Sequence, residues 1–203
     1  KMPVLNTAQT FSQLLDQLIS DQLNPGIQLD LAEAIQSTEI DSLKLKLTEF
    51  QAGESVLDAF SATLYGGDIK AGRRYFLQSS TGQCSRCHSL RGRDGDVGPA
   101  LSGIGKKLSR EQLLEALITP SSRLSPGYGT VSLTLNDGQT VAGILMHESQ
   151  DELILKTGDA EPLEVPVSRI KARTNLPSSM PPMAEIMSKS EIRDVIAFLS
   201  SLE

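Results

Sequence analysis

With 203 residues, of which 39% are apolar, the chain is long enough for one large domain or two small ones and too apolar to be disordered. Its net charge of −6 argues against nucleic acid as the main partner, because phosphate recognition needs a basic surface. The longest unbroken apolar run, Val195–Leu199, is far shorter than the roughly 20 residues that span a bilayer, so the sequence predicts no transmembrane segment in this chain.

Residues 1–65 predict a segment of helices. Apolar side chains recur at intervals of three and four residues over Phe11–Ile19, as they do on the buried face of a helix. Asn24–Pro25 is typical of a helix start, because asparagine caps the first turn and proline fits its first position. Further helices are expected from Thr38 and, after the break at Gly53, from Val56. Nine acidic residues and three lysines indicate a packing module with a solvated acidic face.

A second helical region follows the break at Gly66–Gly67. Asp68–Gln78 predicts its first helix, and Pro120 is expected to stop another helix near Thr119. Two pairs of residues have the spacing of a capping box, which opens a helix: Ser109 with Gln112, and Ser188 with Glu191. The sequence thus predicts helices on both sides of the stretch 124–175.

The stretch 124–175 changes from helical to alternating periodicity. Val131–Leu135 and Val141–Leu145 alternate between apolar and smaller or polar residues, and Asp137–Gly138 between them is a hairpin signal. Two or three further short strands follow, up to Thr174. Four or five antiparallel strands in so short a stretch predict a small, strongly bent sheet or barrel.

The two cysteines of the chain lie together, with a histidine beside them, in Cys84-Ser85-Arg86-Cys87-His88. This is the C-x-x-C-H spacing by which a c-type haem is attached: each thiol adds across one vinyl group, and the histidine ligates the iron. The motif predicts one covalently bound haem c with its iron. Because this attachment takes place outside the cytoplasm, the motif also predicts a periplasmic or otherwise exported protein.

Three alternatives to haem attachment would also place two cysteines at this spacing. A structural zinc site needs four ligands, and apart from the motif the chain offers only one further histidine, His147. A thioredoxin-like dithiol needs a strand–helix–strand pattern around C-x-x-C, which the surrounding Gly, Ser and Arg residues do not give. The third alternative is a chance match.

Residues 66–123 together with 176–203 resemble a class I cytochrome c. Three marks carry the resemblance: Gly72 and Phe76 in the helix before C-x-x-C-H, the stretch Gly98–Leu101, and a Met-Pro loop before a final helix that contains Phe198. More narrowly, the chain resembles the haem-binding domain of large planctomycete- and verrucomicrobial-type dehydrogenases, in which a β insertion precedes the methionine and helical repeats precede the domain. Four stretches fit this subfamily: Gly67–Arg74, Asp96–Pro99, Ile118–Ser121 and Pro126–Tyr128.

The resemblance implies a mainly α chain with a small β insertion: a class I cytochrome c fold in 66–123 plus 176–203, a repeat-like helical segment in 1–65, and an antiparallel insertion in 124–175. It also implies the roles of the site residues. Cys84 and Cys87 would bond the haem, and His88 would ligate its iron. The Pro99 carbonyl would accept a hydrogen bond from the other ring nitrogen of His88, and Leu101 would line the haem pocket.

The sixth iron ligand has two candidates in the same loop. Met180 precedes proline, as in the family's ligand loop, and the β insertion accounts for its long separation from His88. Met183 is the runner-up. Met187 and Met146 are expected to pack in the interior, and His147 is expected at the surface.

Charge is distributed unevenly along the chain. Residues 66–123 carry ten basic and five acidic side chains, between two acidic flanks. Some of these cations are expected to neutralise the haem propionates, with four arginines as candidates: Arg73, Arg74, Arg91 and Arg93. The remaining cations either steer an acidic redox partner or are ordinary solvated charges on a loop.

The sequence therefore predicts a single-haem electron-transfer domain rather than an enzyme. Its donor would be a dehydrogenase module, expected on the same polypeptide, and its acceptor another cytochrome or an oxidase. The alternative is a haem enzyme or a gas or redox sensor with an open sixth coordination site. A partner-binding module built on the β insertion ranks third, because the insertion lacks an aromatic anchor cluster.

Overall fold

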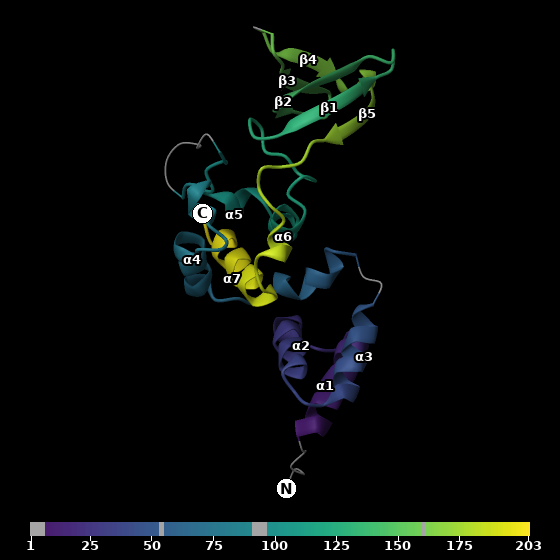
Figure 1. Cartoon of the computed structure of the whole chain (residues 1–203), viewed down its shortest axis with the longest axis vertical. Coiled ribbons are helices and arrows are strands. Elements are labelled where there is room, and N and C mark those ends of the chain that lie inside the picture. The colour runs from purple at the N-terminus through teal and green to yellow at the C-terminus, as the bar shows by residue number, and fades with distance from the viewer. Residues whose placement is uncertain (1–6, 53–54, 91–96, 160) are drawn as a thin grey trace.

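A computed structural model describes residues 7–52, 55–90, 97–159 and 161–203. Three parts follow one another along the long axis of the molecule: three N-terminal helices, a central helical core, and a five-stranded sheet (Figure 1). The fold is thus mixed rather than mainly helical, because the insertion forms a complete antiparallel sheet with an interior of its own.

The N-terminal segment consists of α1 (Thr7–Ile19), α2 (Gln28–Gln36) and α3 (Asp41–Gln51). The predicted start signal at Asn24 is confirmed, since its side chain accepts a hydrogen bond from the Gly26 amide and opens the short helix η1 (Pro25–Ile27). The three helices enclose a separate cluster of buried side chains: Leu15, Leu18, Leu23, Leu31, Ile35, Leu43 and Leu47. The predicted break at Gly53 lies outside the described residues.

The central core is formed by elements that come from both sides of the sheet in sequence. They are η2 (Asp58–Leu64), α4 (Ile69–Gln78), η3 (Cys84–Arg86), α5 (Ile104–Lys107), α6 (Arg110–Ile118), η5 (Met183–Glu185) and α7 (Lys189–Ser200). Both predicted capping boxes are present at the starts of α6 and α7. The one-turn helix α5 was not predicted from the sequence.

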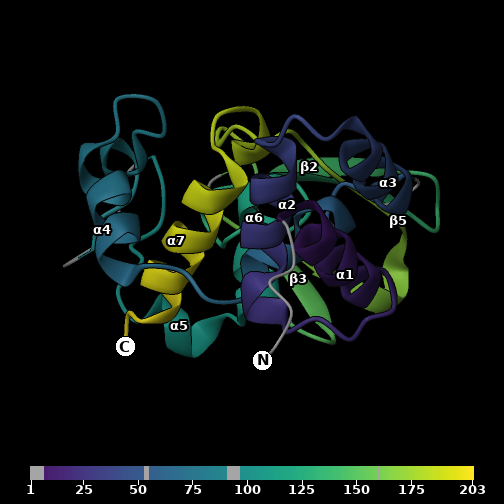
Figure 2. The ribbon, with the colours of Figure 1, turned by 90° about the horizontal axis from the view of Figure 1, so that it is seen from below.

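Helices α4 and α7 cross in close contact (Figure 2). A Cβ atom at Gly72 would lie 1.9 Å from the carbonyl oxygen of Asp194, so only glycine permits this separation of the two backbones. One turn further along α4, the ring of Phe76 packs against that of Phe198 with centroids 5.8 Å apart. This contact fixes the C-terminal helix against the helix that precedes the C-x-x-C-H motif.

The short helix η2 lies just before residue 65, where the sequence analysis places the end of the first part. Leu57, Phe60 and Leu64, in and just before η2, pack against the buried residues of the central core, not against the N-terminal cluster. Sequence periodicity marks a helical stretch but does not say which neighbour its apolar face meets.

The sheet contains β1 (Thr130–Leu135), β2 (Thr140–Glu148), β3 (Glu152–Lys156), β4 (Leu163–Pro166) and β5 (Ile170–Asn175). The strands pair antiparallel in the order β4-β3-β2-β1-β5, which confirms the predicted number and direction of strands. One prediction is wrong: Met146 is 43% exposed and not part of the interior. It follows the buried Leu145, and adjacent residues of a strand point to opposite faces.

Candidate functional site

The C-x-x-C-H motif forms a tight turn directly after α4. The carbonyl of Cys84 accepts hydrogen bonds from the amides of both Cys87 and His88, at 3.2 and 2.9 Å. Within this turn Cys84 is half-buried and Cys87 is exposed. The turn therefore presents one thiol inward and one at the surface, with the histidine directly after them.

The His88 ring is fixed by the hydrogen bond that the resemblance to cytochromes c implies. Its Nδ1 lies 2.9 Å from the carbonyl oxygen of Pro99. A carbonyl can only accept, so Nδ1 carries the hydrogen and the lone pair of Nε2 is left for a metal. A Cβ at the residue before Pro99, Gly98, would lie 3.0 Å from Cε1 of this ring, so glycine allows the Pro99 segment to approach the imidazole.

His88 and Cys84 line a cavity of about 540 Å³ in the central core. Of the other predicted site residues, Pro99, Leu101 and Met180 also line it. Its walls are mostly apolar side chains from the surrounding helices and their flanking loops: Phe76, Leu101, Ile104, Leu108, Leu113, Leu117, Val195 and Leu199. Segments separated by more than 90 residues in sequence thus meet around one apolar space.

Of the two candidates for the sixth ligand, Met180 lines the cavity and Met183 does not. Met180 is half-buried and contributes to the cavity lining. Met183, the first residue of η5, is 4% exposed, belongs to the buried core cluster and is not among the residues that line the cavity. Met187 also packs in the core, and His147 is exposed, both as predicted.

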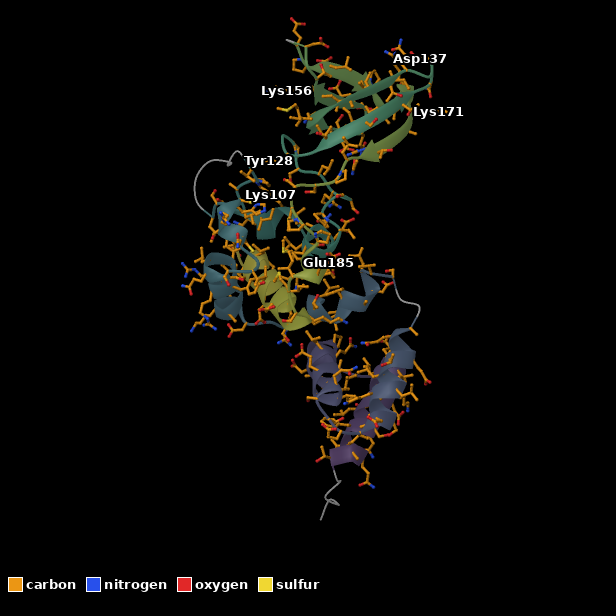
Figure 3. All side chains as sticks on the ribbon, in the orientation of Figure 1. Lys107, Tyr128, Asp137, Lys156, Lys171 and Glu185 are labelled. Carbon is orange, nitrogen blue, oxygen red and sulfur yellow. The ribbon has the colours of Figure 1, made fainter. Side chains whose placement is uncertain are left out.

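The cations at the cavity differ from those expected to neutralise the propionates. Arg73 lines a second, more open hollow near Phe76 and His88, whereas Arg91 and Arg93 lie outside the described residues. The cavity itself is lined by Lys107 and Arg123, together with Tyr128. Lys107 and Tyr128 lie near each other at the end of the central core toward the sheet (Figure 3). The sequence did not identify these three residues as part of the site, although Tyr128 lies in one of the stretches that carry the family resemblance. They come from α5, the segment after α6 and the start of the insertion, and only the fold brings these segments together.

The environment of the cysteines does not favour a zinc site or a reactive dithiol. Burial raises the pKa of the Cys84 thiol, whereas a reactive dithiol or a zinc ligand needs a stabilised thiolate. Among the described residues, no three His, Cys, Asp or Glu side chains lie close enough together to hold a metal ion.

The residues at the cavity fit a haem. The thiol of Cys84, the imidazole of His88 with its Nε2 available, and the thioether of Met180 line one apolar space, and the second thiol, that of Cys87, lies exposed in the same turn. These are the donor types by which cytochromes c hold haem and its iron. A small ion without a macrocycle would leave the apolar walls without a partner. The candidate site is therefore an apolar cavity whose side chains could hold a haem, with His88 and Met180 as the candidate iron ligands.

No protein-family model matches the sequence, and no curated protein matches it either. Across the described ranges, no helix combines the length and the apolar character that a membrane span requires.

Proposed function

We propose that this chain is a single-haem c-type cytochrome domain of class I fold, which transfers one electron and is not itself an enzyme. The observation that carries the proposal is the cavity, where Cys84, His88 and Met180 meet although Met180 is far from the other two in the sequence. The hydrogen bond from His88 to the Pro99 carbonyl supports it further, since a fixed imidazole is a better iron ligand.

The two cysteines attach the haem in a reaction that needs no oxidant. Cys84 and Cys87 would each add their S–H across a vinyl double bond of the haem, with a sulfur–carbon bond formed and the hydrogen passed to the neighbouring carbon. When bound, the haem supplies an iron that alternates between the ferrous and the ferric state. The exposed position of Cys87 leaves one edge of the site near the surface, where electrons can enter and leave.

The remaining residues of the site set the properties of the carrier. His88 and Met180 would hold the iron through a ring nitrogen and a thioether, so that the iron would have no free site for oxygen or peroxide. Thioether ligation would raise the reduction potential above that of bis-histidine ligation. The apolar walls offer a macrocycle a non-polar surface. Lys107 and Arg123, with Tyr128, offer charge and hydrogen bonds to the two haem carboxylates.

An electron carrier requires a donor and an acceptor. The resemblance to haem-binding domains of large dehydrogenases supports a dehydrogenase module as donor, with another cytochrome or an oxidase as acceptor. Because haem is attached to C-x-x-C-H outside the cytoplasm, the protein would act in the periplasm or in another exported location.

Optical spectroscopy of the protein, produced together with haem-maturation machinery, tests the proposal. We expect sharp, low-spin reduced bands and a far-red sulfur-to-ferric-iron charge-transfer band. Met180→Leu should remove the far-red band, whereas Met183→Leu should keep it, because Met183 is buried in the core and does not line the cavity. Leucine nearly conserves the volume of methionine, so neither change should disturb the fold.

The same experiment distinguishes the alternative, a haem enzyme or sensor with an open sixth site. In that case the wild-type spectrum is high-spin, carbon monoxide shifts it at once, and Met180→Leu changes nothing. Failure to recover covalently bound haem from the wild-type protein would contradict both functions.

A further inference from the structure

We propose that the hydroxyls of Ser121 and Ser178 form a relay that ties the Met180 loop to the end of α6, and thereby set how firmly the Met180 sulfur is held at the iron. This positioning role rests on the proposed function, because it needs Met180 as a ligand. Ser121 and Ser178 do not themselves bind iron; they act through the backbone of the ligand loop.

The fixed end of the relay is a proline turn at the C-terminus of α6. The Ser122 amide donates to the Thr119 carbonyl at 2.9 Å, which closes a turn with the buried Pro120 at its second position. Proline presets the backbone angle that this position of a turn needs. The Thr119 amide and hydroxyl both donate to the Glu115 carbonyl, so the turn is rigidly continuous with α6.

Two hydrogen bonds lead from this turn to the ligand loop. The Ser178 amide donates to the Ser121 hydroxyl at 3.0 Å, and the Met180 amide donates to the Ser178 hydroxyl at 3.1 Å. Both are partly buried, so water competes weakly for the groups involved. Pro181 follows Met180 and restricts its backbone to extended conformations. The position of Met180 is thus determined on both sides.

A further tie holds the root of the sheet at the same turn. The side-chain amide of Asn175, the last residue of β5, donates to the carbonyls of Ser121 and Ser122 at 2.9 and 3.2 Å. The insertion lengthens the chain between α6 and Met180, and a longer connection costs more entropy to close. The Asn175 hydrogen bonds hold the two ends of the insertion together, so that the ligand loop is as close to α6 as it would be without the insertion.

The relay predicts a measurable competition at the iron. An added ligand such as imidazole must displace Met180, so its apparent affinity rises by the factor by which methionine ligation weakens. Loss of one hydrogen bond of this kind changes an equilibrium by about fivefold. We therefore expect Ser121→Ala and Ser178→Ala each to bind imidazole about fivefold more tightly than the wild-type protein does.

Ser122→Ala is the matched control, because within the described residues Ser122 contributes only backbone groups to this network. Ser121→Thr keeps a hydroxyl and should restore the wild-type affinity. The measurement is an imidazole titration of the ferric protein, followed by loss of the far-red band. Recovery of the wild-type imidazole affinity in Ser121→Thr, with the fold unchanged, would show that the hydroxyl itself is responsible and not a general loss of stability.

The outcomes separate the two proposals. If the wild-type protein lacks the far-red band, Met180 is not the ligand, and both the proposed function and the relay fail. If the band is present but Ser121→Ala and Ser178→Ala bind imidazole as Ser122→Ala does, only the relay fails. A variant that takes up no haem is compared without haem, by amide hydrogen exchange at Ser178 and Met180; exchange equal to that of Ser122→Ala overturns the relay.

Discussion

The sheet completes its own interior, whereas the central core is built around a cavity. Seven side chains fill the space inside the sheet, and each is less than 5% exposed: Val131, Leu133, Leu135, Leu145, Leu153, Leu155 and Val165. The core helices pack as tightly at the α4–α7 crossing, yet they leave about 540 Å³ beside it. The sheet should therefore be stable by itself, while the core should depend on what occupies its cavity.

The largest expected effect is that of removing both thiols. In Cys84→Ala/Cys87→Ala we expect no covalently bound haem after denaturation, because neither thioether can form. Amides of α4 and α7 should then exchange faster, while those of β1 to β3 keep their protection, since none of the residues that line the cavity belongs to a strand. Mass spectrometry and regional hydrogen exchange measure the two effects, with Ser85→Ala in the same turn as control.

Equal loss of protection in the helices and in the sheet would contradict this prediction. It would mean that the two regions unfold as one unit and that the separate interiors do not confer separate stability.

The next prediction concerns close backbone contacts. Each region has a glycine at which an added methyl group would disturb the packing. A Cβ at Gly72 would meet the Asp194 carbonyl oxygen at 1.9 Å, and one at Gly143 of β2 would meet that of Lys156 at 2.7 Å. We expect Gly72→Ala to destabilise the core by about 3 kcal/mol and Gly143→Ala to destabilise the sheet by about 1–2 kcal/mol. Only Gly72→Ala should alter the haem spectrum.

Urea unfolding followed by haem absorbance and by exchange of the strand amides measures these changes. Gly158→Ala is the control, because a Cβ there would have no neighbour within 4 Å among the described residues. A Gly72→Ala protein with an unchanged unfolding midpoint would show that α4 and α7 can separate without cost.

The local structure of both regions could be predicted from the sequence. Capping residues, turn glycines and prolines act within a few positions, so Asn24, Ser109 and Ser188 mark real helix starts. The predicted strands are correct for the same reason, since alternation and the Asp137–Gly138 turn are local signals. Five of the predicted site residues line the cavity, and they could be found because short sequence motifs mark them without knowledge of the fold.

What could not be predicted depends on contacts between distant segments. Lys107, Arg123 and Tyr128 meet only because α5, α6 and the insertion converge on the cavity. Met180 and Met183 share one loop in the sequence, and the short helix η5 separates them by burying Met183. The sequence left open how η2 packs, because an apolar helical face does not specify its neighbour; in the structure η2 packs on the central core.

Charged side chains should also contribute more to the stability of the core than to that of the sheet, with smaller effects than the glycine substitutions. Arg110 donates to the carbonyls of Leu64 and Gly66 at 2.5 and 2.9 Å and to the Ser200 hydroxyl at 3.3 Å, so it joins three segments of the core. We expect Arg110→Met to cost about 2 kcal/mol. In the sheet, the Arg169 side chain forms an exposed ion pair with Asp137, and Arg169→Met should cost less than about 0.5 kcal/mol. Unfolding midpoints in urea give both values, and equal costs would contradict the contrast.

The smallest expected effect is a pH dependence confined to the core. The Asp68 carboxylate opens α4 by accepting hydrogen bonds from the amides of Ala71 and Lys70, and these bonds lower its pKa below the ordinary 3.8. A carboxyl whose pKa is lowered by folding stabilises the folded state above its unfolded pKa, and this contribution is lost as the pH falls through the folded pKa.

Asp68→Asn keeps an oxygen that can cap the helix but does not titrate. The wild-type protein should therefore be the more stable of the two at pH 7, and the difference should fade below about pH 4. Urea midpoints of α4 and of the strands between about pH 3 and pH 7 test this, and a difference that does not vary with pH would show that the charge on Asp68 contributes nothing to the cap.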